Sequence, residues 1–401
     1  MPPSRHPRAP LTSHGSLKGL LASKEIVICC GPGGVGKTTI AASIATMAAL
    51  REKGKVLVLT IDPARRLADA LGLSSGLGSS EHKVPASAFS SAGAAPRGEL
   101  WAAMLDTKES WDALVRRHSP NERIASQILS NKLYQSISGQ FVQSHDYIAM
   151  EKLFEIHADG KYDLIVVDTP PSRHALDFLE APKRMADFFS SRLLRWLTVP
   201  YRSRLVGMAS RPFYQIADKV LGTQFLEDIV EFFTLFQSMY SGFVDRARSV
   251  NGLLHDERTT FVVVSTLETV PLHEAQFFAS ALQDRGFGLG AVVLNKVLPY
   301  YLRDPAAART AEAMAADPAN LADRLAQCIE ATHVTAEREA LSRVITEVAE
   351  SFRNFQVLAE REMGQESAMT TTAEVVAIAP SLDTDVYSLD GLLALGEHIL
   401  A

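Results

Sequence analysis

The sequence predicts a doubly wound α/β fold with a mostly parallel sheet and an inserted helical subdomain. Short β-branched runs are apolar on both faces, as expected for strands that a parallel sheet buries between two layers of helices. Helical patterns separate most of these runs, and this alternation is typical of doubly wound folds. Two longer stretches without a strand pattern interrupt the alternation, and they predict the helical subdomain.

The elements follow in chain order, beginning with seven strand candidates. These are residues 25–30, 56–61, 100–105, 164–168, 261–266, 291–295 and 375–379. The helical subdomain is expected from residues 107–160 and 177–256. The α/β core is then built from residues 25–106, 161–176 and 257–401, with a further helical insert over 305–362.

Residues 1–24 differ in composition from the rest of the chain. They carry four basic residues, four prolines and no acidic residue. The segment lacks the apolar core of a secretory signal. We therefore expect a disordered basic tail here, in preference to an organellar transit peptide.

The overall composition restricts the class of function. Hydrophobic residues make up 47% of the 401 residues and charged residues 21%, as in soluble globular proteins. The net charge of −6 is unlike the basic footprint of proteins that bind nucleic acid. No apolar run reaches the ~18 residues of a spanning helix. The three cysteines lack the CxxC spacing of a zinc site, and they do not suggest a disulfide framework either. We therefore expect a cytoplasmic protein without zinc, and the net charge leads us to expect no nucleic-acid partner.

A glycine-rich segment, GPGGVGKT at residues 31–38, fits the pattern G-x-x-x-x-G-K-[ST]. Such a loop curls so that successive backbone N–H groups point at phosphate oxygens, and the helix that follows directs its positive end at the same anion. Lys37 adds a charge near the β- and γ-phosphates, and the Thr38 hydroxyl is placed to bind Mg²⁺. Nucleotide contacts are expected from Gly33, Gly34, Val35, Gly36, Lys37, Thr38 and Thr39.

Two aspartates follow predicted strands. Asp62 comes directly after the second strand, and Asp168 ends the fourth. In a parallel sheet both positions lie at the carboxyl ends of strands, where the phosphate loop also lies. A carboxylate in this position usually holds Mg²⁺, and a second one can orient the attacking water.

These segments together resemble the ArsA/Get-type ATPases, the arsenite-pump and tail-anchored-protein-targeting family of deviant Walker A P-loop NTPases. The resemblance rests on GGVGKTT (33–39), TIDPARRLADALG (60–72), VVDTPPSRHALDFL (166–179), FVVVSTLETVPLHEA (261–275) and VVLNKVLPY (292–300), in the family's order. The closing segment AIAPSLDTDVYSLDGL (377–392) also matches, so that the resemblance spans about residues 20–400.

The resemblance implies an ATPase that uses ATP and Mg²⁺. It assigns Asp62 to activation of the hydrolytic water, and Asp168 to a Mg²⁺-linked switch that continues to His174. It also implies that Asn295 hydrogen-bonds adenine, that Pro380 lies near the base and that Glu268 lies near the nucleotide. The family further implies a homodimer with facing nucleotide sites.

The chain departs from the family in three ways. The family's signature lysine, which reaches the partner subunit's phosphates, is replaced by Pro32, and Arg65 or Arg66 is either its substitute or a solvated surface arginine. The zinc-binding cysteine pair of eukaryotic targeting factors is absent, as is the arsenite-binding cysteine triad. The pump ATPase has two tandem halves, and this chain has one.

The second helical stretch is rich in aromatic residues. Nine of the 18 phenylalanines lie between Phe178 and Phe243, many at helical spacing. Two interpretations remain open at this stage. The stripes either form the core of the subdomain, or part of them lines a groove for a hydrophobic client segment or a membrane-protein partner. The favoured function is a targeting or chaperone-like ATPase, and the alternative is the energising subunit of an anion or metalloid (arsenite) efflux system.

Overall fold

The computed structural model describes most of the chain. The described residues are 16–52, 54–61, 66–73, 80–137, 144–170, 180, 183–184, 187, 231–235, 238–330, 337–369 and 373–400. Asp62, Arg65 and His174 lie outside these ranges. Most of the phenylalanine-rich stretch also lies outside them, including Phe178, Phe225 and Phe236.

Within the described residues, eight strands form one sheet in the order β3-β4-β2-β5-β1-β6-β7-β8. Their bounds are β1 Ile26–Cys30, β2 Lys55–Thr60, β3 His82–Lys83, β4 Glu99–Met104, β5 Leu164–Asp168, β6 Thr259–Ser265, β7 Leu289–Val297 and β8 Val375–Pro380. Every pair is parallel except β3–β4. The predicted parallel α/β sheet is therefore confirmed. Strand β3 was not predicted, because two residues are too short to show a period.

In the parallel strands, successive residues face two different hydrophobic clusters. Ile26 and Ile28 belong to one cluster, and Val27 and Cys29 to the other. The second cluster is covered by helices α1 (Leu17–Leu21), α2 (Lys37–Arg51), α3 (Arg66–Ala70), α4 (Ala86–Ser91) and α19 (Leu389–Ile399). The chain thus has the doubly wound layering in which both faces of the sheet are buried.

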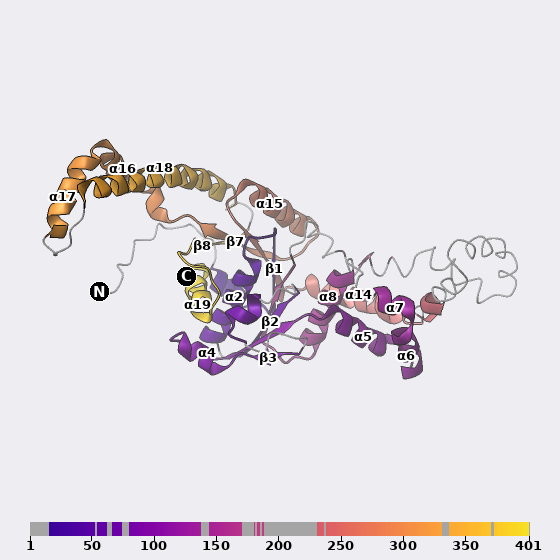
Figure 1. Cartoon of the computed structure of the whole chain (residues 1–401). Coiled ribbons are helices and arrows are strands. Elements are labelled where there is room, and N and C mark those ends of the chain that lie inside the picture. The colour runs from indigo at the N-terminus through magenta and orange to yellow at the C-terminus, as the bar shows by residue number, and fades with distance from the viewer. Residues whose placement is uncertain are drawn as a thin grey trace.

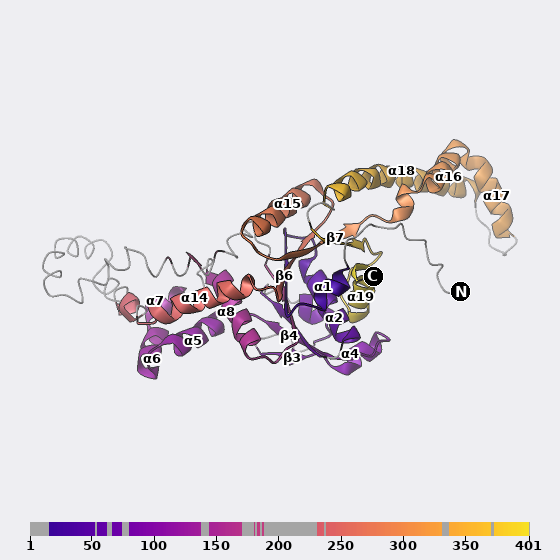
Figure 2. The ribbon, with the colours of Figure 1, turned by 180° about the vertical axis from the view of Figure 1, so that it is seen from behind.

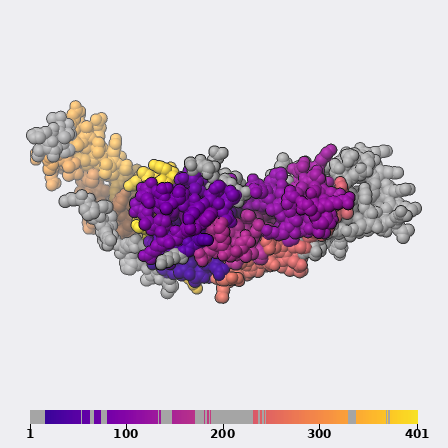
Figure 3. Space-filling view, turned by 90° about the horizontal axis from the view of Figure 1, so that it is seen from below, coloured from indigo at the N-terminus to yellow at the C-terminus, as the bar shows by residue number. Residues whose placement is uncertain are grey.

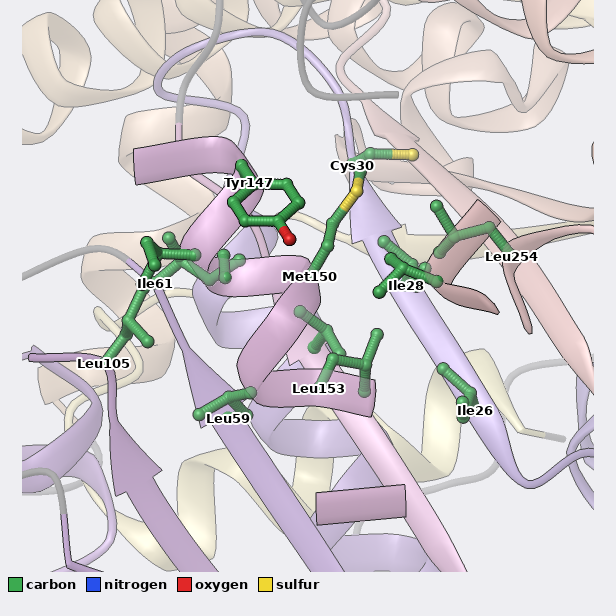
Figure 4. Packing of buried hydrophobic residues seen from close by; sticks show 14 of the residues in the cluster. Ile26, Ile28, Cys30, Leu59, Ile61, Leu105, Tyr147, Met150, Leu153 and Leu254 are labelled. Atoms are coloured by element: carbon green, nitrogen blue, oxygen red, sulfur yellow. The ribbon is translucent and has the colours of Figure 1, made fainter. Parts of the chain in front are cut away.

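Helices from the two predicted helical stretches cover the first cluster. These are α5 (Thr107–His118), α6 (Glu122–Ser130), α7 (Lys132–Ile137), α8 (Ser144–Ala158) and α14 (Tyr240–Leu254), joined by α15 (Thr269–Asp284). Figure 4 shows Met150 and Leu153 of α8 facing Ile28 and Leu59 of the sheet. Helices α5 and α14 both pack on α8 and extend beyond the sheet with α6 and α7 (Figure 1).

A helical arm leaves the opposite side of the sheet beyond β7. It contains η1 (Tyr300–Arg303), α16 (Pro305–Ala316), α17 (Pro318–Glu330) and α18 (Arg338–Met369). Helices α16 and α17 both pack on α18. Figure 2 shows the arm and the α5–α7 helices projecting in opposite directions, and Figure 3 shows the same elongation in space-filling form. The arm occupies the stretch in which the sequence predicts a helical insert.

The end of the predicted tail differs from the expectation of disorder. Residues Leu17–Leu21 form helix α1, and Ser16 Oγ caps it by accepting the Gly19 N–H at 3.1 Å. Leu17 and Leu21 are buried. Their spacing of four residues puts both on one helix face, and the burial of that face against the sheet stabilises this short helix. Among the described residues, no helix has the length and apolar character needed to cross a membrane.

Candidate nucleotide site

The loop between β1 and α2 has the left-handed backbone that its glycines permit. The φ angles of Gly31, Gly34 and Gly36 are 142°, 79° and 90°. A Cβ atom on Gly31 would lie 2.1 Å from the carbonyl oxygen of Val264 on β6. Glycine is therefore required at Gly31 by close approach as well as by conformation. Gly33 and Gly34 are exposed, so a ligand has access to the backbone of the loop.

Lys37 begins helix α2 and folds back over the loop. Its Nζ donates a hydrogen bond to the Pro32 carbonyl oxygen at 2.7 Å, and the residue is 6% exposed. Thr38 and Thr39 follow in the first turn of α2 and are half-buried. The structure thus brings the predicted lysine, threonines and glycines together at one helix N-terminus, where an anion is favoured.

Asp168 lies at the end of β5, between β1 and β2. Its register partners are Cys29 on one side and Thr60 on the other. The residue is fully buried, and its Oδ2 accepts a hydrogen bond from Thr60 Oγ1 at 3.0 Å. Thr60 was not predicted to belong to the site: it begins the segment TIDPARRLADALG (60–72), but neither the motif nor its position in an apolar strand gave it a role.

The pKa of the neighbouring Cys29 thiol depends on the charges around the site. Burial raises its pKa well above the ordinary value, the Asp168 carboxylate raises it further, and Lys37 lowers it. Burial likewise raises the pKa of Cys30. Cys29 therefore lies within electrostatic range of both the predicted magnesium-binding carboxylate and the predicted phosphate-binding lysine.

The segment that carries Asp62 starts beside Asp168. The backbone N–H of Ile61 donates to the Asp168 carbonyl oxygen at 3.0 Å, so β2 and β5 end at the same level. Asp62 itself lies outside the described residues. The structure therefore fixes where its segment begins, and the catalytic role of Asp62 stays a prediction.

Comparison with known proteins agrees with this geometry. The family model of the anion-transporting ATPases matches residues 24–335. The chain belongs to this family. An ATPase ASNA1 homolog of Entamoeba dispar is 24% identical over 72% of this chain and 82% of its own length. The ATPase GET3 of Malassezia globosa is 26% identical over 71% and 76%, and an arsenical pump-driving ATPase 2 of Aquifex aeolicus is 25% identical over 67% and 79%.

This ArsA/Get-type ATPase holds Asn295 against the phosphate loop. The side-chain Nδ2 of Asn295 donates to the Val35 carbonyl oxygen at 2.8 Å, and its Oδ1 accepts the Lys296 N–H at 2.9 Å. Asn295 is 6% exposed. These contacts were not predicted from the sequence, which suggested only a contact with adenine.

The two other residues predicted near the nucleotide lie on neighbouring elements of the ATPase. Pro380 ends β8 and is the register partner of Val297 on β7. Glu268 is the exposed N-cap residue of α15, which follows β6. Both therefore lie at the carboxyl ends of strands, at the same edge of the sheet as the phosphate loop.

Two residues in the described part of the phenylalanine-rich stretch are buried in the hydrophobic core. Phe232 is 4% exposed and Met239 is fully buried, and both belong to the hydrophobic cluster beneath α8 and α14. Phe233 packs against Phe232 with ring centroids 5.1 Å apart. Of the two interpretations left open by the sequence, these residues favour the core.

Proposed function

We propose that this ATPase binds Mg²⁺-ATP at residues 31–39 and couples its hydrolysis to a rearrangement of the helical subdomain that the sequence predicts over residues 107–160 and 177–256. The observation that supports the binding site is the loop itself. Gly31, Gly34 and Gly36 have positive φ angles, the accessible backbone of the loop precedes a helix N-terminus, and Lys37 is positioned over the loop. Family membership supports the ATPase activity.

Each residue has a distinct part in the proposed reaction. With nucleotide bound, Lys37 would exchange its hydrogen bond to the Pro32 carbonyl for β- and γ-phosphate oxygens, and Thr38 and Asp168 would hold Mg²⁺. The metal supplies positive charge that stabilises the charge developing on the phosphates. Asp62 orients the attacking water. Asp168 is followed in sequence by the expected switch segment, and the predicted helical stretch 177–256 comes next in the chain.

Two substitutions test these roles. Lys37→Ala is expected to abolish tight ATP binding, and Lys55→Ala, an exposed lysine at the start of β2, is the matched control. Asp62→Asn is expected to preserve ATP binding while lowering turnover at least about 100-fold, because it removes a water-orienting carboxylate. Turnover by Asp62→Asn at the wild-type rate would refute the assignment.

We also propose that the chain forms a homodimer with facing nucleotide sites. The family resemblance supports the dimer. Pro32 has neither a side-chain charge nor an N–H group, so it cannot make the contact with the partner subunit's phosphates that the family's lysine makes. Specific activity should then rise with protein concentration. Sedimentation that shows only monomer with a bound ATP analogue would contradict the dimer.

The client of the ATPase is proposed to be an apolar helical segment of another protein, bound in the cytosol. The supporting observation is the concentration of phenylalanines between Phe178 and Phe243. Because Phe232 lies in the core, the groove has to be formed by other members of the stretch. Phe232→Ser is therefore expected to destabilise the fold by about 3–5 kcal/mol, as for large-to-small core changes.

Phe236→Ser provides the contrasting test. In a groove it should leave the melting temperature and basal ATPase unchanged while abolishing ATP-dependent binding of a hydrophobic peptide. If Phe232→Ser and Phe236→Ser both lower the melting temperature and the wild type binds no peptide, the stretch forms only a hydrophobic core and the proposed groove is refuted.

The alternative function is energising an anion or metalloid efflux system, and the pump-driving relative supports it. Against it, the cysteines do not form one cluster. Cys29 and Cys30 are buried in β1, whereas Cys328 is exposed on α17 at the far end of the arm (Figure 1). Stimulation of the ATPase by arsenite, measured beside stimulation by a hydrophobic peptide, distinguishes the two functions.

A further inference from the structure

Strand β7 is irregular at the point where it reaches the phosphate loop. Its pairing with β8 passes from Leu294–Ile378 directly to Val297–Pro380, so that two residues of β7 lie opposite one residue of β8. Asn295 and Lys296 form this bulge. A bulge redirects a side chain and is over-represented beside functional sites.

Lys296 has the backbone conformation that the bulge demands. Its φ is 58°, and among the described residues it is the one non-glycine residue with a positive φ. Its side chain is exposed, so the conformation is not imposed by packing of the lysine itself. An unfavourable backbone conformation of this kind persists only where the surrounding structure holds it.

The surrounding structure holds the segment on both sides. The Val297 carbonyl oxygen accepts the Ser381 N–H at 2.8 Å, and the Leu298 N–H donates to Glu362 Oε2 on α18 at 3.0 Å. Arg303 pairs in turn with Glu366, one helical turn further along α18, at 2.8 Å. The bulge is thus tied to β8 and to the helical arm.

Because of the bulge, the Asn295 side chain contacts two consecutive residues of the phosphate loop, Val35 and Gly36. Its Nδ2 bonds the Val35 carbonyl, and a Cβ atom on Gly36 would lie 2.4 Å from the same nitrogen. In a trans peptide the carbonyl and the following N–H point in opposite directions. Holding the Val35 carbonyl toward Asn295 therefore turns the Gly36 N–H away from Asn295, and it does so directly before Lys37.

We propose that Asn295 is a positioning residue for the phosphates. Held by the bulge at Lys296, it acts through Val35 and Gly36 to fix the backbone of the loop in the geometry that the transition state requires. This role is separate from any contact with adenine. It rests on ATP hydrolysis at this loop, which is part of the proposed function.

The test is the division of the effect between kcat and KM. Asn295→Ala removes both hydrogen bonds, and Asn295→Asp keeps the acceptor for the Lys296 N–H but loses the donor to Val35. Both variants are expected to lower kcat for ATP by about 10–100-fold, as small misplacements of reacting groups do. A residue that only recognises adenine predicts instead a raised KM with unchanged kcat, and that result would overturn the proposal.

A second pair of variants avoids changing Asn295. Lys296→Gly accommodates the positive φ, whereas the β-branched side chain of Lys296→Val opposes it. The glycine variant is expected to have a kcat about 10-fold or more above that of the valine variant. Lys55→Val, at an exposed strand position, controls for the change of side chain.

The two Lys296 variants decide the question even if Asn295→Ala fails to fold, which its melting temperature would reveal. Equal kcat values for Lys296→Gly and Lys296→Val would refute the positioning role. An inactive wild-type protein would refute ATP hydrolysis at the loop instead, so the two failures are distinguishable.

Discussion

Thr60 Oγ1 donates a hydrogen bond to Asp168 Oδ2 across neighbouring strands, with 3.0 Å between the two oxygens. Both residues are buried, and both lie at the carboxyl end of the sheet beside the phosphate loop. A buried carboxylate has few rotamers to choose from once one of its oxygens is fixed in this way. Thr60 therefore orients the side chain that we expect to hold the hydrated Mg²⁺.

This relationship predicts different effects for the two residues. Asp168→Asn should lower Mg²⁺-dependent turnover by about 10–100-fold, as for groups that bind a metal through its outer shell. Thr60→Val should lower the free energy of unfolding by about 1–3 kcal/mol, because it leaves a buried carboxylate without one donor. Thr60→Ser, which keeps the hydroxyl, should restore most of that stability in urea unfolding. A valine variant as stable as the serine variant would contradict the orienting role.

The glycines of the loop predict an unequal response to alanine. Gly34 and Gly36 both have positive φ, but a Cβ on Gly34 meets nothing within 4 Å, whereas one on Gly36 meets Asn295 Nδ2 at 2.4 Å. Both alanine variants carry a left-handed penalty of roughly 1–2 kcal/mol. Gly36→Ala should also displace Asn295 and therefore have the lower kcat of the two. Equal kcat values in steady-state ATPase assays would show that the contact at Gly36 has no effect on the reaction.

Cysteine reactivity follows from burial and pKa. Cys29 and Cys30 are buried, and burial raises the pKa of both thiols, so they stay protonated and unreactive at pH 8–9. Cys328 is exposed on α17 and is therefore accessible to reagents in the solvent. Treatment of the native protein with iodoacetamide should modify Cys328 alone, whereas the urea-unfolded chain should be modified at all three cysteines. Mass spectrometry of tryptic peptides measures this pattern, and rapid native labelling of Cys30 would refute it.

A buried ion pair predicts the stability of the helices beyond the sheet. Arg246 Nε on α14 lies 2.8 and 2.9 Å from the two carboxylate oxygens of Glu151 on α8, and the Arg246 guanidinium stacks on Phe154 at 4.0 Å. Glu151→Ala should lower the free energy of unfolding by about 3–5 kcal/mol, because it leaves a largely buried cation without its partner. The double variant with Arg246→Met should recover part of the loss, as measured by urea unfolding. Additive losses in the double variant would contradict this coupling.

The sheet and the phosphate loop could be predicted from the sequence because each depends on local patterns. Buried parallel strands have continuous apolar runs, and the loop has a motif with a strand before it and a helix after it. Helix α1 escaped prediction because its stability comes from the burial of Leu17 and Leu21 against distant residues. The composition of residues 1–24 predicted disorder and could not show the surface on which Leu17 and Leu21 pack.

The position of Asn295 illustrates the limit for the site. The sequence identified the residue, but the bond to Val35 joins positions 260 residues apart and depends on a bulge between β7 and β8. No periodicity reveals such a bulge, because it is a property of two paired strands. Phe232 is the corresponding case among the helices, since a helical stripe has the same sequence pattern whether its face is covered or open.

The helical arm is anchored near the nucleotide site and extends far from it. Helix α18 has 32 residues, and Glu362 and Glu366 fix it near its C-terminal end to the segment that follows Asn295. At 1.5 Å per residue, the part between Arg338 and Glu362 is about 37 Å long. A pivot of about 5° at Glu362 would then sweep the far end, with α17, through about 3 Å, an amplification that follows from the helix rise alone. Distance probes placed on α17 would therefore be more sensitive to nucleotide state than probes placed at the phosphate loop itself.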